Sequence, residues 1–426
     1  MRLLVLGDFS GKPTGERPAL ASRRTQRVDV DNIDDVMRRL EPRVNVPSGE
    51  IAFEHIDDFH PDRLYARMDL FQTLRAARAT PASAASAEGD DMLGRLLGKP
   101  SVPRTAAAAT PASGLDAMIR DIVAPHIVKD TSAITTAHVA AVDLAIAAQM
   151  RAILHAPAFQ SLEAAWRGVR WLISSLELDE NLQLHLFDVT REELLADIVS
   201  AQGKLPETGV FRAVVDRTRN ASGGNGWSAL VALLHFGPSD ADIGLLAALG
   251  LIAAQARGPL LAGADLALAR DDAAKLAGWQ ALRRSEAAPW IGLAAPRVLL
   301  RLPYGKETDP VETFAFEEFA GPPVHDEFLW GNASLAMALL LGRSFTARGW
   351  EMEPGDEREI GDLPAYTFVQ DGEREMQACA EHFLPEPEIN RLLQSGLVPF
   401  ASRRDRNAIV AVRFQSVSDP SAPLVW

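Results

Sequence analysis

Apolar residues recur at helical spacing in two long stretches in the middle of the chain. In each stretch a hydrophobic residue follows every three or four positions, which is typical of helices with one buried face. Pro157 lies between the two stretches and predicts two separate helices. The stretches consist of Val139, Val142, Ile146, Met150 and Ile153, and of Phe159, Leu162, Trp166, Val169 and Ile173.

Beyond these helices, short apolar runs alternate with longer amphipathic runs. We predict strands at Leu184–Val189, Val210–Asp216, Ala229–Phe236, Arg297–Tyr304 and Ala408–Gln415. We predict helices at Glu192–Ala201, Asp240–Ala256, Asp265–Leu276 and Leu329–Arg348. This alternation predicts an α/β fold with mixed α+β layers.

Residues 1–78 form a smaller unit with a mixed pattern. Arg2–Phe9 is predicted as a strand, and Ile51 with its neighbours as a half-buried second one. Asp31–Leu40 is predicted as a helix, because it is acidic at its start and basic at its end, as the helix dipole favours. Pro61–Ala77 is predicted as a further helix.

Residues 79–113 are rich in Ala, Ser, Thr and Pro, and burial of such residues does not offset their ordering entropy. We interpret them as a linker between a small part, residues 1–78, and a large part, residues 114–426. A short apolar island inside the linker is a possible short helix. The island consists of Met92, Leu93, Leu96 and Leu97.

Composition narrows the class of protein. The 426 residues are 47% hydrophobic, so a sizeable core can form, and the net charge of −14 argues against nucleic acid and anionic membranes as partners. The single cysteine, Cys379, excludes an internal disulfide and a cysteine-rich zinc site. The longest apolar run, Ile243–Ala256, is too short to span a bilayer, and no targeting segment is visible. We therefore expect a cytoplasmic protein without membrane insertion.

One stretch near the start resembles a phosphate-binding loop without fulfilling its requirements. Three residues instead of four separate Gly7 from Gly11, and Pro13 follows Lys12 where the loop needs Ser or Thr. Proline also removes a backbone donor. We expect a tight surface turn here.

A second stretch gathers two histidines and two aspartates without the spacing of a metal site. We expect Asp57 or Asp58 to cap the helix that Pro61 begins, and His55 and His60 to be ordinary surface residues.

Catalytic signatures are missing from the sequence. It contains no GxSxG and no HExxH, and Cys379 is expected to be a small, partly buried residue. His126 and His155 are expected to be isolated structural histidines, and Ser222–Gly226 a loop. We predict no catalytic residue, no cofactor and no metal, which favours an interaction or structural role. A ligand-binding or enzymatic α/β protein is the alternative.

Tryptophan and arginine alternate in the stretch Ala165–Trp171. These residue types often anchor interfaces, but a helix buried in its own domain explains the pattern equally well. The candidate anchors are Trp166, Arg167, Arg170 and Trp171.

Six stretches between residues 140 and 416 occur in the order found in one known family. They are Ile153–Ile173, Ala295–Gly305, Phe314–Phe319, Phe328–Trp350, Gly361–Phe368 and Leu392–Ser416. Together they resemble TssC (VipB), the large subunit of the contractile sheath of type VI secretion systems. Trp330, inside the fourth stretch, is a further candidate interface anchor.

Three stretches of the small part resemble TssB (VipA), the small sheath subunit. They are Leu6–Pro13, Val28–Val44 and Ile51–Leu64. The two subunits are normally separate chains, so the resemblance implies a fused protomer with the small part packed on the large one.

The resemblance also implies partners. It implies a cytoplasmic structural protein that contacts sheath, baseplate or inner-tube components, with neighbouring subunits joined by strand exchange. A AAA+ unfoldase recycles such sheaths by gripping a helix near the start of the large subunit, and the island Met92–Leu97 matches that helix by position.

The chain departs from the family at both ends. It begins directly with its first strand and stops at Trp426, before the family's last exchanged strand. We therefore expect an accessory, terminal or baseplate-proximal component, with a conventional polymerising fused subunit as the alternative.

Overall fold

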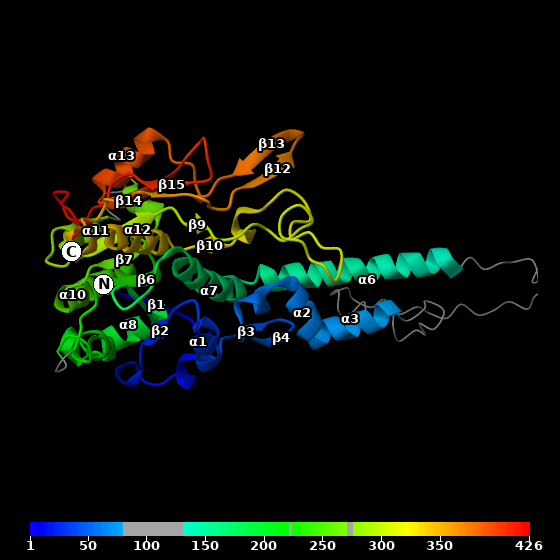
Figure 1. The fold of residues 1–426 in the computed structure, drawn as a ribbon, viewed down its shortest axis with the longest axis horizontal. Coiled ribbons are helices and arrows are strands. Elements are labelled where there is room, and N and C mark those ends of the chain that lie inside the picture. The colour runs from blue at the N-terminus through cyan, green and yellow to red at the C-terminus, as the bar shows by residue number, and fades with distance from the viewer. Residues whose placement is uncertain (80–130, 221–223, 271–275) are drawn as a thin grey trace, which may run out of the picture.

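The computed structural model describes residues 1–79, 131–220, 224–270 and 276–426 (Figure 1). Its helices are α1 (Ile33–Leu40), α2 (Pro61–Arg67), α3 (Asp69–Ala79), α6 (Thr131–Leu154), α7 (Pro157–Ser175), α8 (Arg191–Ser200), α9 (Gly209–Phe211), α10 (Asp240–Ala256), α11 (Ala277–Arg283), α12 (Ala333–Arg348) and α13 (Glu386–Gln394).

The described strands form one large sheet and three small ones. They are β1 (Arg2–Gly7), β2 (Gln26–Val28), β3 (Arg43–Val46), β4 (Gly49–Ala52), β5 (Gln183–Asp188), β6 (Ala229–Phe236), β7 (Leu260–Ala264), β8 (Ile291–Ala295), β9 (Val298–Leu299), β10 (Trp330–Gly331), β11 (Glu359–Ile360), β12 (Tyr366–Gln370), β13 (Glu373–Gln377), β14 (Leu397–Ser402) and β15 (Ile409–Ala411). The large sheet has the order β11-β15-β14-β8-β7-β6-β1-β5-β2.

The first strand of the chain lies inside the large sheet. β1 pairs in parallel with β5 on one side and with β6 on the other, so that Leu3 stands between Leu184 and Ala229. The small part is therefore built into the sheet of the large part, which is a closer union than the expected packing of one part on the other.

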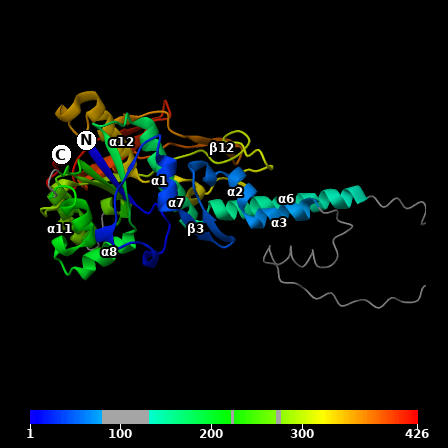
Figure 2. The same ribbon diagram turned by 60° about the horizontal axis from the view of Figure 1, so that its bottom comes forward.

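Alternate residues of β1 face two separate hydrophobic layers. Leu3 and Val5 are buried in the layer that contains α1, α7 and α12. Leu4 and Leu6 are buried in the layer on the opposite face, with α8, α10 and α11. Figures 1 and 2 show helices on both faces of the sheet, as the predicted α/β class requires.

Helices α3 and α6 run side by side and project away from the sheet in both ribbon views. Arg78 of α3 forms an ion pair with Asp143 of α6 at 2.6 Å, and His138 lies 3.0 Å from the carbonyl oxygen of Ala77. This pairing gives the two parts a second contact, remote from the sheet.

Most of the predicted elements are confirmed. The structure contains the strands near Arg2–Phe9, Leu184–Val189 and Ala229–Phe236, and helices within residues 31–40, 192–201 and 240–256. Of the predicted helix Leu329–Arg348, the part from Ala333 onward is helical, and Trp330–Gly331 is the strand β10. The two periodic stretches form α6 and α7, and Pro157 is the first residue of α7.

The prediction for Val210–Asp216 is wrong, because this run is helical. It forms α9 and then a π-helical turn, Arg212–Asp216. Asp197 accepts hydrogen bonds from the backbone N–H groups of Gly209 and Val210, both at 2.8 Å. This distant carboxylate starts a helix where β-branched residues favoured a strand.

Other boundaries differ from the predictions. The predicted helix Pro61–Ala77 is broken at Met68, which has extended backbone angles. Of Arg297–Tyr304, only Val298–Leu299 is a strand, and of Ala408–Gln415, only Ile409–Ala411. The described part of Asp265–Leu276 holds a short 3₁₀ turn, and α11 begins after it.

Candidate functional site

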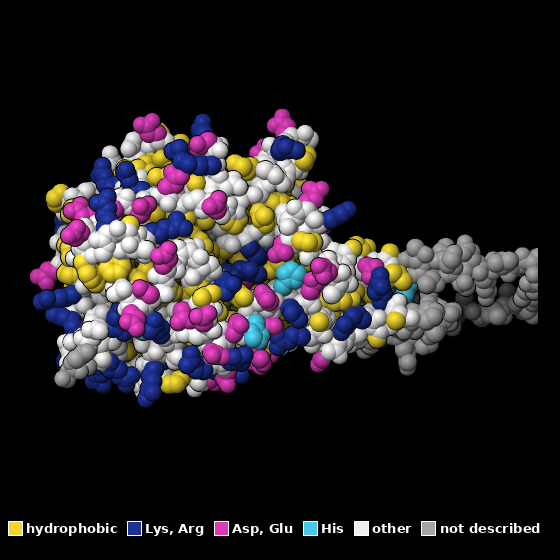
Figure 3. Space-filling model, viewed as in Figure 1, with side chains coloured by type: hydrophobic (Ala, Val, Ile, Leu, Met, Phe, Trp, Pro, Cys, Tyr) yellow, Lys and Arg dark blue, Asp and Glu magenta, His cyan; other side chains and the backbone are white. Residues whose placement is uncertain are grey.

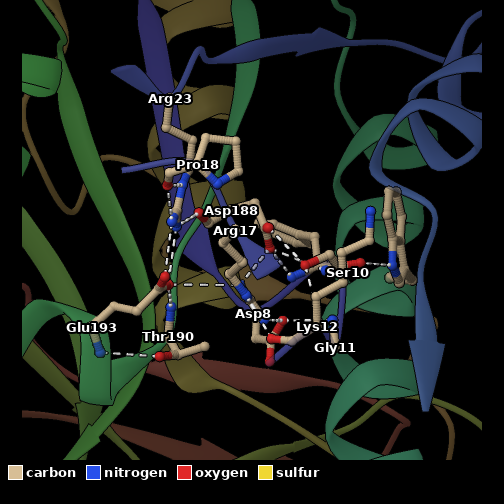
Figure 4. Close-up of polar contacts among 12 residues, drawn as sticks. Asp8, Ser10, Gly11, Lys12, Arg17, Pro18, Arg23, Asp188, Thr190 and Glu193 are labelled. Atoms are coloured by element: carbon tan, nitrogen blue, oxygen red, sulfur yellow. Dashed lines mark hydrogen bonds and ion pairs between the residues drawn. The ribbon is translucent and has the colours of Figure 1, made fainter. Parts of the chain in front are cut away.

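The carboxyl ends of β1 and β5 carry a cluster of charged residues that joins the two parts (Figure 4). Asp188 ends β5 directly beside Gly7 of β1. Its carboxylate accepts hydrogen bonds from the backbone N–H of Phe9 at 2.8 Å and of Ser10 at 3.0 Å, and from the Ser10 hydroxyl at 2.8 Å. The large part thus fixes the loop that follows β1.

Two buried arginines of the small part complete this junction cluster. Arg17, whose side chain is 1% exposed, donates to Asp188 at 3.2 Å and to Asp8 at 2.6 Å. Arg23 donates to both carboxylate oxygens of Glu193, at 2.8 and 3.0 Å. We define the junction cluster as Asp8, Ser10, Arg17, Arg23, Asp188 and Glu193.

Glu193 serves both the junction cluster and its own helix. Its carboxylate accepts from the backbone N–H of Thr190, while the Thr190 hydroxyl accepts from the N–H of Glu193, so the pair caps α8. Burial raises the pKa of Glu193, but the hydrogen bonds from Arg23 and the Thr190 N–H, together with the charges of Arg23 and Arg17, outweigh it, and the net pKa is lowered. The charged form is therefore held in place between the parts.

The junction cluster fills a place where other α/β proteins bind ligands. Such proteins use the carboxyl ends of parallel strands. In this sheet the strand order reverses between β1 and β6, next to the cluster at the ends of β1 and β5. Here Ser10 and Arg17 of the same chain satisfy the Asp188 carboxylate. Of the expected tight surface turn at residues 7–15, Pro13–Gly15 is exposed, whereas Phe9 and Ser10 are buried against the large part.

A hollow of about 620 Å³ lies beside the junction cluster, near the starts of α7 and α12. Two of its lining arginines are already paired, Arg191 with Asp242 and Arg297 with Glu381. Asn332, also in its wall, caps α12 by accepting from the Ser334 N–H at 3.0 Å. These polar groups already have partners within the chain, which argues against the ligand-binding alternative at this hollow.

Aromatic residues reinforce the joint. The predicted anchor Trp166 is fully buried, and its indole N–H donates to the carbonyl oxygen of Phe9 at 2.9 Å. Phe53 and Phe59 of the small part pack on Phe159 of α7, with ring centroids 5.9 and 5.6 Å away. Trp166 thus anchors a contact inside the chain, and any contact with another subunit stays a prediction.

A second buried cluster surrounds Arg301 in the large part. Arg301 bonds to Glu163 at 2.9 Å and to Glu318 at 2.7 Å. The predicted anchor Arg167 bonds to the same Glu163 at 2.6 Å and to the Tyr304 hydroxyl at 2.7 Å. Arg167 is therefore part of the internal packing between α7 and the segment after β9.

The pKa of Glu318, a carboxylate of this cluster, is strongly lowered. Burial raises its pKa, but Arg301 and hydrogen bonds from His155, Arg301 and the Tyr304 amide lower the net value to about 2. His155 lies 3.5 Å from Glu318 and 3.4 Å from Glu327, which are contacts within the fold, as expected of a structural histidine.

The other predicted anchors lie in different surroundings. Arg170 is exposed beside a hollow that His55 and Asp58 also line, and Trp171 is half-buried against the core. Trp330 is buried, with its ring against Phe328 at 5.7 Å. Among these candidates, Arg170 presents the most open surface to a partner.

The expected cap by Asp57 or Asp58 is corrected by the structure. His60 caps α2, since its ring nitrogen accepts from the Asp62 N–H at 3.2 Å. Asp58 instead accepts from the N–H groups of Glu54 and His55 at the preceding turn. Its position before Pro61 resembles a cap, but its side chain points back along the chain.

Several predictions fall outside the described residues. These are the island Met92, Leu93, Leu96 and Leu97, nearly all of the predicted linker 79–113, His126, and part of Ser222–Gly226. Cys379, as expected, is buried, with its sulfur 3.8 Å from the carbonyl oxygen of Leu363.

The surface in Figure 3 carries acidic and basic side chains interspersed, without a large field of one sign on this face. Within the described residues, no single helix has both the length and the apolar composition to cross a membrane. One pair, His138–Leu154 with Pro157–Ser175, passes that test only jointly and is bent by 65° at its break.

Comparison with known proteins gives matches to both parts. Residues 136–418 match the family model of VipB, the tail sheath N-terminal domain, and residues 1–86 match that of VipA of the type VI secretion system. The sheath protein TssC1 of Pseudomonas aeruginosa is 31% identical over 70% of the chain, and TssB1 of the same organism is 36% identical over 17%. The chain spans 66% and 49% of the lengths of these two relatives.

Proposed function

The chain belongs to the VipB family of type VI secretion sheath proteins, with a VipA-like part at its amino end, and we propose that it works as a single-chain sheath protomer. In this role both parts form one structural body. Its work is mechanical, and its family members are sheath proteins rather than enzymes.

The observation that carries this proposal is the position of β1 between β5 and β6. A central strand cannot leave a parallel sheet without exposing the hydrophobic layers on both faces. Fusion also fixes a one-to-one ratio of the parts and raises their effective concentration to about millimolar. The fused chain is therefore suited to enter an assembly as a finished unit.

We further propose an accessory, terminal or baseplate-proximal position in the sheath. The edges of the large sheet support this, because β2 has three residues and β11 has two. Short edge strands offer few backbone groups for pairing with a strand from a neighbour. This geometry favours a component with limited lateral joining over the main repeating subunit.

The proposed partners are other type VI secretion components, namely sheath, baseplate or inner tube, in the cytoplasm. Arg170 and Trp171 on α7 are the proposed contact residues on the described surface. Recognition of Met92–Leu97 by a AAA+ unfoldase remains part of the proposal.

Negative-stain electron microscopy of the purified full chain tests the accessory role. Small, monodisperse particles are the expected result. Long hollow tubes would overturn the accessory role and favour a conventional polymerising fused subunit. A circular dichroism spectrum with helix and strand content matching the structure confirms that the imaged particles are folded. An Arg170→Ala variant with unchanged spectrum then tests the contact surface, with weaker pull-down of sheath components as the expected outcome.

A further inference from the structure

Three side chains converge on one point near the edge strand β9. His325 comes from the 3₁₀ turn His325–Glu327 that precedes β10, while Glu381 and His382 follow β13. The backbone N–H of Glu381 donates to the carbonyl oxygen of Arg297 at 2.9 Å, which fixes this segment against the start of β9. The two histidines therefore approach the carboxylate from neighbouring segments held by the same strand.

The distances among the three groups match a tetrahedral metal site. The Glu381 Oε1 atom lies 3.2 Å from Nε2 of His325 and 3.6 Å from Nε2 of His382. One ligand atom from each of the three residues lies within 4.8 Å of the others. Ligand bonds of about 2.0–2.1 Å at tetrahedral angles place ligand atoms roughly 3.3 Å apart, close to these values.

His325 is bonded to a carboxylate through one ring nitrogen and faces this point with the other. Its Nδ1 lies 3.0 Å from the Asp326 carboxylate, which only accepts hydrogen bonds when ionised, so a ring that donates there through Nδ1 can offer Nε2 to a cation. The opposite nitrogen, Nε2, is buried and has no hydrogen-bond partner. A carboxylate behind a histidine is the arrangement that orients metal-binding imidazoles. The Glu381 oxygen 3.2 Å away makes Nε2 of His325 a place where a proton or a metal cation is stabilised.

Glu381 can bind such a cation while it accepts hydrogen bonds from Arg297. The Arg297 side chain donates to Oε2 at 2.9 Å and to Oε1 at 2.6 Å. Each carboxylate oxygen has two acceptor sites, so Oε1 retains one that faces the histidines.

We propose that His325, Glu381 and His382 bind a divalent transition-metal cation of the zinc class, with a water or a partner side chain as the fourth ligand. Nitrogen and carboxylate oxygen are suitable ligands for zinc. The cation would tie the segment after β13 to the turn before β10, where Trp330 stacks on His325 at 5.5 Å. The proposal is independent of the position of the protein in a sheath.

Isothermal titration of the full-length, tag-free and metal-free chain with zinc chloride tests the proposal. We expect one zinc ion per chain, and a cobalt(II) titration should produce the intense visible bands of a tetrahedral site. His382→Ala, an exposed position, should weaken zinc binding at least tenfold, and His325→Gln should do the same. Asp326→Asn should weaken binding about 10- to 100-fold through the orientation of His325.

His55→Ala is the matched control, because it removes a histidine beside a carboxylate, Asp34, elsewhere on the surface. Zinc binding should be unchanged in this variant. Binding no tighter than millimolar, or binding that survives His382→Ala, would overturn the proposal. In that case the cation between His325 and Glu381 is a proton. Unchanged circular dichroism spectra of all variants exclude misfolding as the cause of a loss.

Discussion

At the scale of single residues, the two parts are held together by buried groups of opposite charge that pair with each other. Asp188 accepts three hydrogen bonds from the loop after β1 and one from Arg17. Partly removing a buried ion pair is strongly destabilising, because it leaves the remaining charge without a partner. The junction cluster should therefore determine stability more than the ion pairs on the surface.

Replacement of Asp188 tests the contribution of the junction cluster to stability. Asp188→Asn keeps the size of the side chain but removes the charge opposite Arg17, and we expect a loss of about 3 kcal/mol in the free energy of unfolding. Urea unfolding followed by circular dichroism provides the measurement. Glu207→Gln, which breaks an exposed pair with Lys204, is the control and should change the urea midpoint little. Equal effects of the two variants would contradict the assigned role.

His185 on β5 should make stability depend on pH. Burial, and then Arg2 and Arg27, lower its pKa from 6.5 to about 4. The unfolded chain therefore binds the proton first, so stability is complete above pH 6.5 and falls as the pH decreases toward 4. The shift corresponds to at most about 3 kcal/mol.

His185→Gln should remove this part of the pH dependence. Urea midpoints measured between pH 5 and 6.5 should change less steeply in the variant than in the natural chain. This range lies above the titration of Glu318, whose pKa of about 2 makes it lose its stabilising charge only at lower pH. His55→Gln, at an exposed position, should retain the natural slope. If the urea midpoint of His185→Gln changed with pH as steeply as that of the natural chain, His185 would be ruled out as the source of this pH dependence.

At the scale of elements, sequence patterns predicted those with strong local signals. Helices α8 and α10 have capping residues, Thr190 and Ser239, whose side chains accept hydrogen bonds from the first turn. Strands β7, β8 and β14 were missed because they are short and buried on both faces. Such strands show no alternation, and β7 and β8 are built largely from Leu and Ala, which also suit a helix.

The site was less predictable than the fold, because its contacts are distant in the sequence. Ser10 meets Asp188 across 178 positions, and Glu163 meets Arg301 across 138. Trp166 was identified from its residue type, but its partner, the Phe9 carbonyl, could not be. The histidines around Glu381 also gave no local signal, and the histidine pair that the sequence did suggest, His55 and His60, lies elsewhere.

Two glycines of α10 offer a matched test of helix packing. A Cβ atom on Gly250 would lie 2.5 Å from Ile291 Cδ1 and 3.0 Å from Ala287 Cβ, whereas one on Gly244 would meet nothing within 4 Å. Gly250→Ala should destabilise by about 1–3 kcal/mol. Gly244→Ala should stabilise by about 0.5–1 kcal/mol, because alanine loses less backbone entropy in a helix. If both variants shifted the urea midpoint in the same direction, this packing of α10 on β8 would be contradicted.

At the scale of the whole molecule, the two parts share one sheet, two hydrophobic layers and the pairing of α3 with α6. The joint therefore does not depend on the covalent connection between them. Since Leu3 through Leu6 are buried on both faces of the sheet, separation would expose both layers at once.

Cutting the chain tests this independence. A specific protease site placed between residues 80 and 130 should yield two fragments that co-elute in size-exclusion chromatography under native conditions. They should separate only in denaturant, and at a lower denaturant concentration when Asp188→Asn is also present. Fragments that separate in native buffer would show that the joint is weaker than its burial indicates.

The location of β1 also has a consequence for synthesis on the ribosome. The strand β1, Arg2–Gly7, is made before both of its neighbours and can pair with them only after Asp188 and then Phe236 have been translated. At about 5–20 residues per second, this interval lasts on the order of ten to fifty seconds. During that time the apolar strand β1 has no neighbouring strands to pair with. The nascent chain is thus expected to need chaperone protection early, and a slower translation rate through residues 100–236 should increase its aggregation.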